Sequence, residues 1–84
     1  MAALTSMMNI GKEMERKLVS VGIHSAEELI AAGAEQAFSR LKAAYPQVCL
    51  VHLYTLEGAI TSTEFHSLSG EKKKELKRFS DSLK

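Results

Sequence analysis

The segment from Val48 to about Ser62 constrains the fold most, because it is apolar on most sides of a helix. Such a helix needs neighbours on several sides, and it finds them in the centre of a helical bundle. The run from Val48 to Val51 taken alone is also compatible with a strand, but no other segment of the chain offers it a partner strand. The segment therefore predicts a central helix packed among other helices.

Two helices are predicted before residue 34. Asn9 is the expected N-cap of the first helix, because its side chain accepts from free first-turn amides. The stripe of this helix is Ile10, Met14, Leu18 and Val21, and Gly22 is expected to end it in a left-handed conformation. Ser25 and Glu28 match a capping box at the start of a second, short helix. That helix is expected to bury Leu29 and Ile30 and to end at Gly33.

Two further helices complete the count of five. The third is expected to place a stripe toward the core and to end before Pro46, which cannot continue a helix. That stripe is Ala34, Ala37, Phe38, Leu41, Ala44 and Tyr45. Phe65 and Leu68 are predicted loop anchors. Ser69 is the expected cap of the last helix, which carries an apolar seam of Leu76, Phe79 and Leu83.

An 84-residue chain with 45% hydrophobic and 25% charged residues has room for one domain and one core. The predicted fold class is all-α: a compact five-helix domain that contains a helix-hairpin-helix-like (SAM-like) unit. Residues 1–8 are expected to be an N-terminal arm or a short first turn. Residues 9–84 are expected to form the single helical domain.

The cellular location and the absence of membrane contact are inferred from features that the sequence lacks. A single cysteine, Cys49, excludes an internal disulfide and is typical of cytosolic proteins. The first ten residues lack the basic start and apolar run of a signal peptide. The longest apolar stretch is too short and too interrupted to span a bilayer. We expect a cytoplasmic protein with no membrane partner.

Charge is unevenly distributed, although the whole chain carries only +1. The residues after Gly70 carry a net +3, and the residues before it a net −2. The candidate basic patch on the last helix is Lys73, Lys74, Lys77 and Arg78. A charge run on a terminal helix is most often a solvated face, and Glu71 and Glu75 stand among these cations. Contact with nucleic acid and simple solvation both remain open.

The first two helices and their junction suggest a phosphate site. An apolar residue and glycine at a helix start, followed about eleven residues later by Gly-Ile and a serine cap, are typical of helix-hairpin-helix units. Glycine lets a ligand approach the backbone, and a helix N-terminus favours an anion. The candidate phosphate- or DNA-binding residues are Ile10, Gly11, Lys12, Gly22 and His24. The alternative is that Gly11 only permits close helix packing and that Lys12 is solvated.

The sequence offers little for catalysis or metal binding. Cys49 and His52 lie three residues apart on one expected helix, but two ligands do not make a metal site, and His24 and His66 have no ligand spacing to them. Cys49 is interpreted as a buried small hydrophobe. Glu57 has no local partner for acid–base chemistry, so it is interpreted as a helix-edge group that ties down a loop or a backbone amide. We expect no catalytic residue, no metal and no cofactor.

Several motifs together resemble the C-terminal domain of the TfoX/Sxy proteins, regulators of bacterial competence for DNA transformation. The run from Leu53 to Ile60 is the most specific, and the motifs cover nearly the whole chain. They are Asn9-Ile10-Gly11, Leu18 with Val21-Gly22-Ile23, Glu28-Leu29, Ala32-Gly33-Ala34, Ala37-Phe38, Pro46 to Leu50, Leu53 to Ile60, and Glu71-Lys72-Lys73 before Leu76. The resemblance implies a helical domain with a regulatory role and supplies no catalytic residues.

Full-length members of that family pair this domain with an N-terminal α/β domain and act with the cyclic-AMP receptor protein at competence promoters. The expected function is therefore a non-catalytic protein- or DNA-binding module of transcription regulation. Its expected partners are double-stranded DNA, bound weakly through the hairpin, and the transcription machinery or the cyclic-AMP receptor protein. One alternative is a stand-alone protein-interaction or self-assembling domain without DNA contact. A small metal-binding protein or enzyme is the other, and it requires an activity of Cys49, His52 or Glu57.

Overall fold

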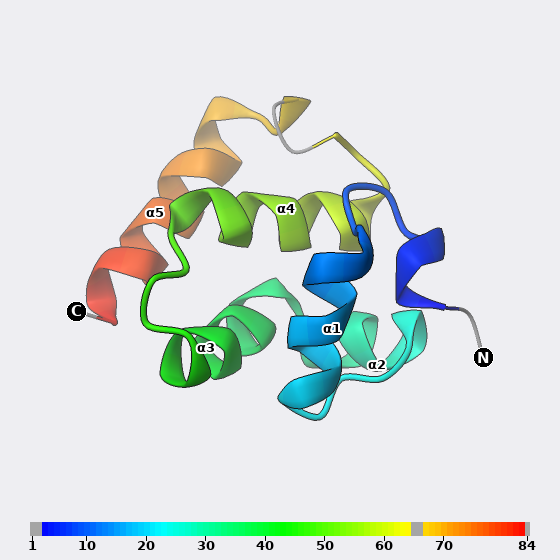
Figure 1. The fold of residues 1–84 in the computed structure, drawn as a ribbon. Helices are drawn as coiled ribbons and strands as arrows, with labels where there is room; N and C mark the ends of the chain where they lie inside the picture. The colour runs from blue at the N-terminus through cyan, green and yellow to red at the C-terminus, as the bar shows by residue number, and fades with distance from the viewer. Residues whose placement is uncertain (1–2, 65–66, 84) are drawn as a thin grey trace.

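The central helix predicted from the apolar segment is present in the computed structural model, which describes residues 3–64 and 67–83. Helix α4 (Leu50–Thr61) crosses the middle of the molecule (Figure 1) and packs against α3 (Ala34–Ala44) and α5 (Gly70–Ser82). Its buried residues include Leu53, Leu56 and Ala59. The helix begins two residues later than Val48, which is buried in the loop before it.

The elements that precede α3 are a 3₁₀ turn, η1 (Leu4–Ser6), and the helices α1 (Lys12–Ser20) and α2 (Ala26–Ala32). The all-α fold with five α-helices is confirmed, and no strand occurs in residues 3–64 and 67–83. The segment expected to be an arm or a first turn contains η1, whose Leu4 is buried against α1 and α2. The first residues of the described chain therefore contribute to the core.

The start of α1 differs from the prediction that Asn9 is its N-cap. The N-cap is Gly11, and it offers no side chain to the first turn. Asn9 has a φ of 73°, a left-handed conformation that an N-cap does not use. Its side-chain amide donates to the carbonyl of Thr63 at 3.0 Å. A bond to a residue 54 positions away has replaced the local cap, and no local pattern predicts such a bond.

The junction between α1 and α2 confirms the stop at Gly22. Gly22 has a φ of 91°, and its N–H donates to the carbonyl of Val19 at 3.1 Å. The N–H of Ile23 donates to the carbonyl of Leu18 at 2.9 Å, which completes a Schellman motif. Gly33, where α2 was expected to end, also has a positive φ, 84°.

Of the two hydrogen bonds predicted for the capping box at the start of α2, one is present. Ser25 Oγ accepts from the N–H of Glu28 at 3.2 Å, as expected. The Glu28 carboxylate, however, accepts from the N–H of His24 at 2.9 Å instead of that of Ser25. The carboxylate thus holds the incoming loop one residue further back and still fastens the loop to the helix.

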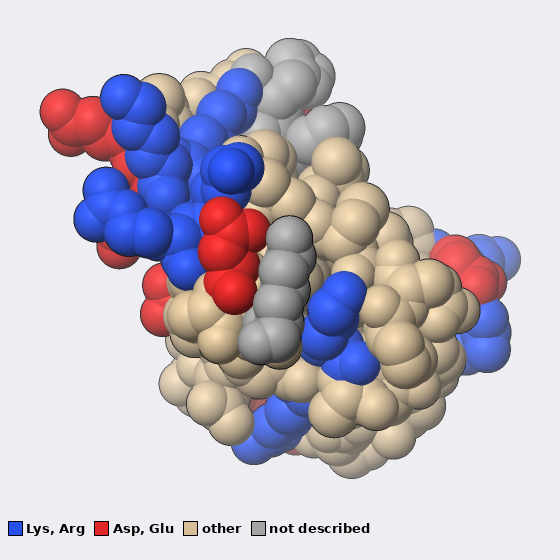
Figure 2. All heavy atoms as spheres, turned by 90° about the vertical axis from the view of Figure 1, so that its left-hand side faces the viewer, with Lys and Arg blue, Asp and Glu red and all other residues tan. Residues whose placement is uncertain are grey.

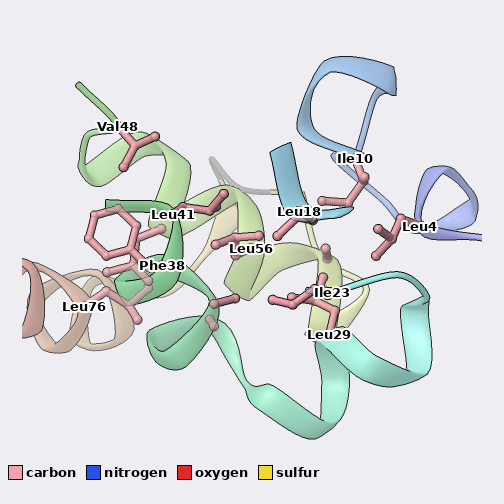
Figure 3. Packing of buried hydrophobic residues seen from close by; sticks show 14 residues of the cluster. Leu4, Ile10, Leu18, Ile23, Leu29, Phe38, Leu41, Val48, Leu56 and Leu76 are labelled. Carbon is pink, nitrogen blue, oxygen red and sulfur yellow. The ribbon is translucent and has the colours of Figure 1, made fainter. Parts of the chain in front are cut away.

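One buried cluster joins all the elements (Figure 3). Phe38 and Leu76 lie at one end of it, Leu4 and Ile10 at the other, and Leu56 between them. The expected burial of Ile30 is wrong, because this side chain is 54% exposed and Leu29 alone fills the inward position of the short α2. Ala44, expected in the stripe of α3, is also exposed.

The structure describes one of the two predicted loop anchors and the whole apolar seam predicted for the last helix. Phe65 lies outside the described residues, and Leu68 is half-buried. In α5, Leu76 is buried, Phe79 is half-buried and Leu83 is 37% exposed. The apolar seam of α5 is therefore not fully covered by the rest of the chain. Among the described helices, none combines the length and the apolar character needed to cross a membrane.

Replacing Leu56 by alanine should test the central role of α4. Leu56 is fully buried, so Leu56→Ala should lower the free energy of unfolding by about 2–5 kcal/mol. Val51→Ala is the matched control, because Val51 lies on the same helix and is 50% exposed; its effect should stay within about 0.5 kcal/mol. Urea unfolding followed by circular dichroism measures both, and equal losses would contradict the central position of Leu56.

A pair of glycine variants should test the stop at Gly22. Gly22→Ala forces an L-residue into a φ of 91° and should cost about 1 kcal/mol or more of stability. Gly70→Ala, in the first turn of α5, meets no atom within 4 Å and should be neutral or slightly stabilising. Thermal unfolding of both variants gives the comparison, and a stable Gly22→Ala protein would refute the requirement for glycine.

Candidate functional site

The five predicted phosphate-binding residues do not converge on one place. Ile10, Gly11 and Lys12 lie at the start of α1, whereas Gly22 and His24 follow its end. A helix of nine residues is about 14 Å long, so the two groups are separated by that distance. Ile10 is also buried, and its N–H donates to the carbonyl of Met7 at 3.3 Å. The structure does not confirm the helix-hairpin-helix-like unit as a phosphate site.

Carboxylates stand at both helix starts where a phosphate was expected. Glu13 and Glu15 lie in the first turn of α1, and Glu27 and Glu28 in that of α2. A hydrogen bond from Arg16, and secondarily its charge, lowers the pKa of Glu13 below the ordinary value, so this carboxylate stays ionised. Carboxylates therefore stand where the two helix N-termini would otherwise attract an anion.

The predicted basic patch, in contrast, is brought together on α5. Lys73 and Lys77 form one stripe along the helix, and Lys74 and Arg78 form the adjacent one. Figure 2 shows lysine and arginine side chains gathered over this helix with carboxylates among them. Lys77 Nζ lies 3.6 Å from an Asp81 oxygen, so part of this charge is compensated within the helix.

Cys49 and His52 form a helix cap. The backbone N–H of Cys49 donates to His52 Nδ1 at 3.1 Å, and the Cys49 Sγ lies 3.5 Å from the same nitrogen. The interpretation of Cys49 as a buried hydrophobe is wrong, because it is the exposed N-cap of α4 and not part of the helix. In the described part of the chain, no group of three or more potential ligands could hold a metal ion. His66 lies outside that part.

His52 is held in its neutral form. Partial burial is the main cause that lowers its pKa from 6.5, and the charge of Lys17 lowers it further. A neutral imidazole accepts the Cys49 N–H through Nδ1, which stabilises the first turn of α4.

One concave surface was not predicted from the sequence. It is a groove of about 590 Å³ between α5 and the junction of α2 with α3, which we call the α5 groove. Its lining is Ala32, Gly33, Ala34, Glu35, Gln36, Ser39, Glu57, Lys72, Glu75, Leu76, Phe79 and Leu83. The sequence signals for it were Glu57, as a carboxylate within an apolar helix, and the apolar seam of the last helix.

Glu57 and Tyr54 of α4 both contact residues of α5. Within residues 3–64 and 67–83, the Glu57 carboxylate ties down neither a loop nor a backbone amide; it faces the α5 groove, 3.9 Å from Lys72 Nζ. Tyr54 is half-buried, and its hydroxyl donates to the carbonyl of Lys73 at 3.4 Å. That bond attaches α5 to α4 beside the groove.

The five α-helices, with α4 at their centre, define a small all-helical domain, and comparison with known proteins identifies its family. The family model of the TfoX C-terminal domain matches residues 1–80, and the chain belongs to this family. It is not a known enzyme family.

Two crystal structures of proteins from Listeria monocytogenes are similar to the chain, and each is 41% identical to it. The first, described as an uncharacterized protein in a triclinic form, has a TM-score of 0.94 over 98% of this chain and 93% of its own. The second, described as a protein of unknown function in a tetragonal form, has a TM-score of 0.92 over 96% of this chain and 99% of its own. The comparison with curated proteins yields no match.

The pH dependence of stability should report the environment of His52. The unfolded chain protonates His52 near pH 6.5 and the folded protein protonates it at lower pH. Stability is therefore fully present above pH 6.5 and falls as the pH drops toward the folded pKa. His52→Gln keeps an acceptor for the Cys49 N–H and should lose less stability between pH 7.5 and 5, as measured by urea unfolding. Equal losses would show that His52 is not held neutral.

Proposed function

We propose that this chain is a non-catalytic binding module of a TfoX-type regulator, acting in the cytoplasm on genes for DNA transformation, and that it binds a protein partner through the α5 groove. The observation that carries the proposal is the groove itself. Its volume of about 590 Å³ lies within the range of ligand-binding clefts. Apolar side chains of α5 remain open to solvent there, with Leu83 at 37% exposure.

Protein binding is favoured over DNA binding by the positions of the charges. The residues expected to hold a phosphate lie at the two ends of α1 and stand beside carboxylates. The net charge of +1 supplies little of the attraction that dominates protein–DNA affinity. A groove with an apolar wall on its α5 side, with carboxylates and with few cations suits a polypeptide better than a phosphate backbone.

The class of partner follows from the family. Members of the TfoX/Sxy type act with the cyclic-AMP receptor protein, so this receptor or the transcription machinery is the partner class that we propose. Within this proposal, the helical domain contributes a contact surface, and the chemistry of transcription belongs to the partner.

A second candidate function is weak contact with double-stranded DNA through the outer face of α5. The observation in its favour is the set of four cations within two helical turns: Lys73, Lys74, Lys77 and Arg78. If all four neutralised phosphates, the logarithm of the affinity would fall against the logarithm of the salt concentration with a slope of roughly −3 to −4. Such binding would be independent of DNA sequence.

Variants in the source organism should separate the two candidates. Glu35→Lys combined with Leu83→Glu changes the α5 groove at exposed positions, and transcripts of DNA-uptake genes should fall to the level of a deletion strain. Lys74→Glu combined with Arg78→Glu is the matched control and should leave these transcripts near the wild-type level. RNA sequencing is the measurement.

Each contrary outcome of that experiment has a defined meaning. Unchanged transcripts in the deletion strain would overturn the regulatory role. Loss only in the Lys74→Glu/Arg78→Glu strain would favour DNA contact, and an amide-shift titration with a generic DNA duplex at low and physiological salt would then show whether α5 moves.

A further inference from the structure

The α5 groove carries more negative than positive charge. Three carboxylates, Glu35, Glu57 and Glu75, line it, and Lys72 is the only cation among its lining residues. Lys72 Nζ lies 3.9 Å from Glu57 and 3.7 Å from Glu75, so one ammonium is shared between two carboxylates at long range. A further cation in the α5 groove would therefore meet carboxylates whose negative charge Lys72 does not fully compensate.

The Glu57 carboxylate should attract a cation more strongly than a carboxylate on the open surface. Its side chain is only 15% exposed, whereas that of Glu75 is 63% exposed. Charges in a partly buried place are screened less by water and salt than exposed ones. A cation that reaches Glu57 would be held more strongly than one at the rim.

The groove also has an apolar wall with helical spacing. Leu76, Phe79 and Leu83 follow one another at intervals of three and four residues over about 10 Å of α5. Opposite them, Gly33 lies at the junction of α2 and α3, and a Cβ built on it would meet no atom within 4 Å. The space beside Gly33 is therefore open to an approaching segment.

We propose that the α5 groove binds an amphipathic helical segment of a partner protein, with aliphatic residues on one face and lysine or arginine beside them. This inference rests on the proposed function and adds the chemistry of the partner to it. The aliphatic face covers Phe79 and Leu83, and the cationic side chains pair with Glu57 and with Glu35 or Glu75 at the rim. Such docking of a helix in a groove is a common mode of peptide recognition. DNA and acidic peptides are disfavoured there, since their charges would face the carboxylates.

Selection from a displayed library of random peptides tests this chemistry without assuming a sequence. Peptides of about 16 residues are long enough for roughly four helical turns. Selected on the wild-type chain, the enriched peptides should be amphipathic and carry net positive charge. Their binding should move the amides that line the α5 groove, and their affinity should fall as salt is raised.

Variants of the chain then separate the charged and apolar contributions. Glu35→Gln combined with Glu75→Gln removes two rim charges and should weaken the enriched peptides about tenfold. Glu15→Gln, a carboxylate on α1 outside the groove, is the matched control and should leave the affinity unchanged. Leu83→Ala should weaken binding about threefold, because it removes part of the apolar surface that the aliphatic face of the peptide covers.

The possible results are distinguishable. Enriched peptides that are neutral or acidic, but still move the groove amides, would overturn the charge preference and leave the proposed protein-binding function standing. Peptides that move no groove amide, or no enrichment at all, would overturn both. Concentration-dependent association of the chain alone, with shifts in the same amides, would replace the partner segment by a second copy.

Discussion

Burial of α4 between α3 and α5 is the constraint on which the other elements depend. A helix that is apolar on most sides loses its stability unless neighbours remove it from water. The buried side chains of α3, among them Phe38 and Leu41, cover one side of it, and Leu76 of α5 joins the same cluster. The short helices α1 and α2 complete the core from the other end with Leu18 and Leu29, and Ile23 joins them from the junction between the two helices.

The α5 groove arises from the way in which α5 covers this core. Only Leu76 of α5 is buried, while Phe79 and Leu83 remain partly open beside the α2–α3 junction. Burial of Leu76 and the hydrogen bond from the Tyr54 hydroxyl to Lys73 hold the first half of the helix and leave one flank uncovered. The same helix thus presents cations on its outer face and an apolar, acidic-rimmed groove on its inner flank. These two surfaces have different physical chemistry and suit different partners.

Local sequence patterns predicted those features of the fold that depend on a few neighbouring residues. Gly22 and Gly33 end helices because they occupy positive φ, and Ser69 and Ser25 cap helices through bonds to residues three positions on. The failures share another property. Asn9 binds Thr63, Ile30 points to solvent and Cys49 caps α4, and each outcome depends on which surface a distant element covers. The candidate phosphate residues lie apart for a different reason, since the length of α1 separates its start from its end.

The sequence by itself therefore determined an all-helical domain, its five α-helices, the central place of α4 and the family resemblance that the comparison confirms. Helical periodicity and end signals are local, so they can be interpreted before the chain is folded. Only the tertiary structure decided that Glu35, Glu57 and Glu75 meet at one groove with the open end of the α5 seam. These residues come from three helices, and the distances among them follow from packing angles that no local pattern encodes.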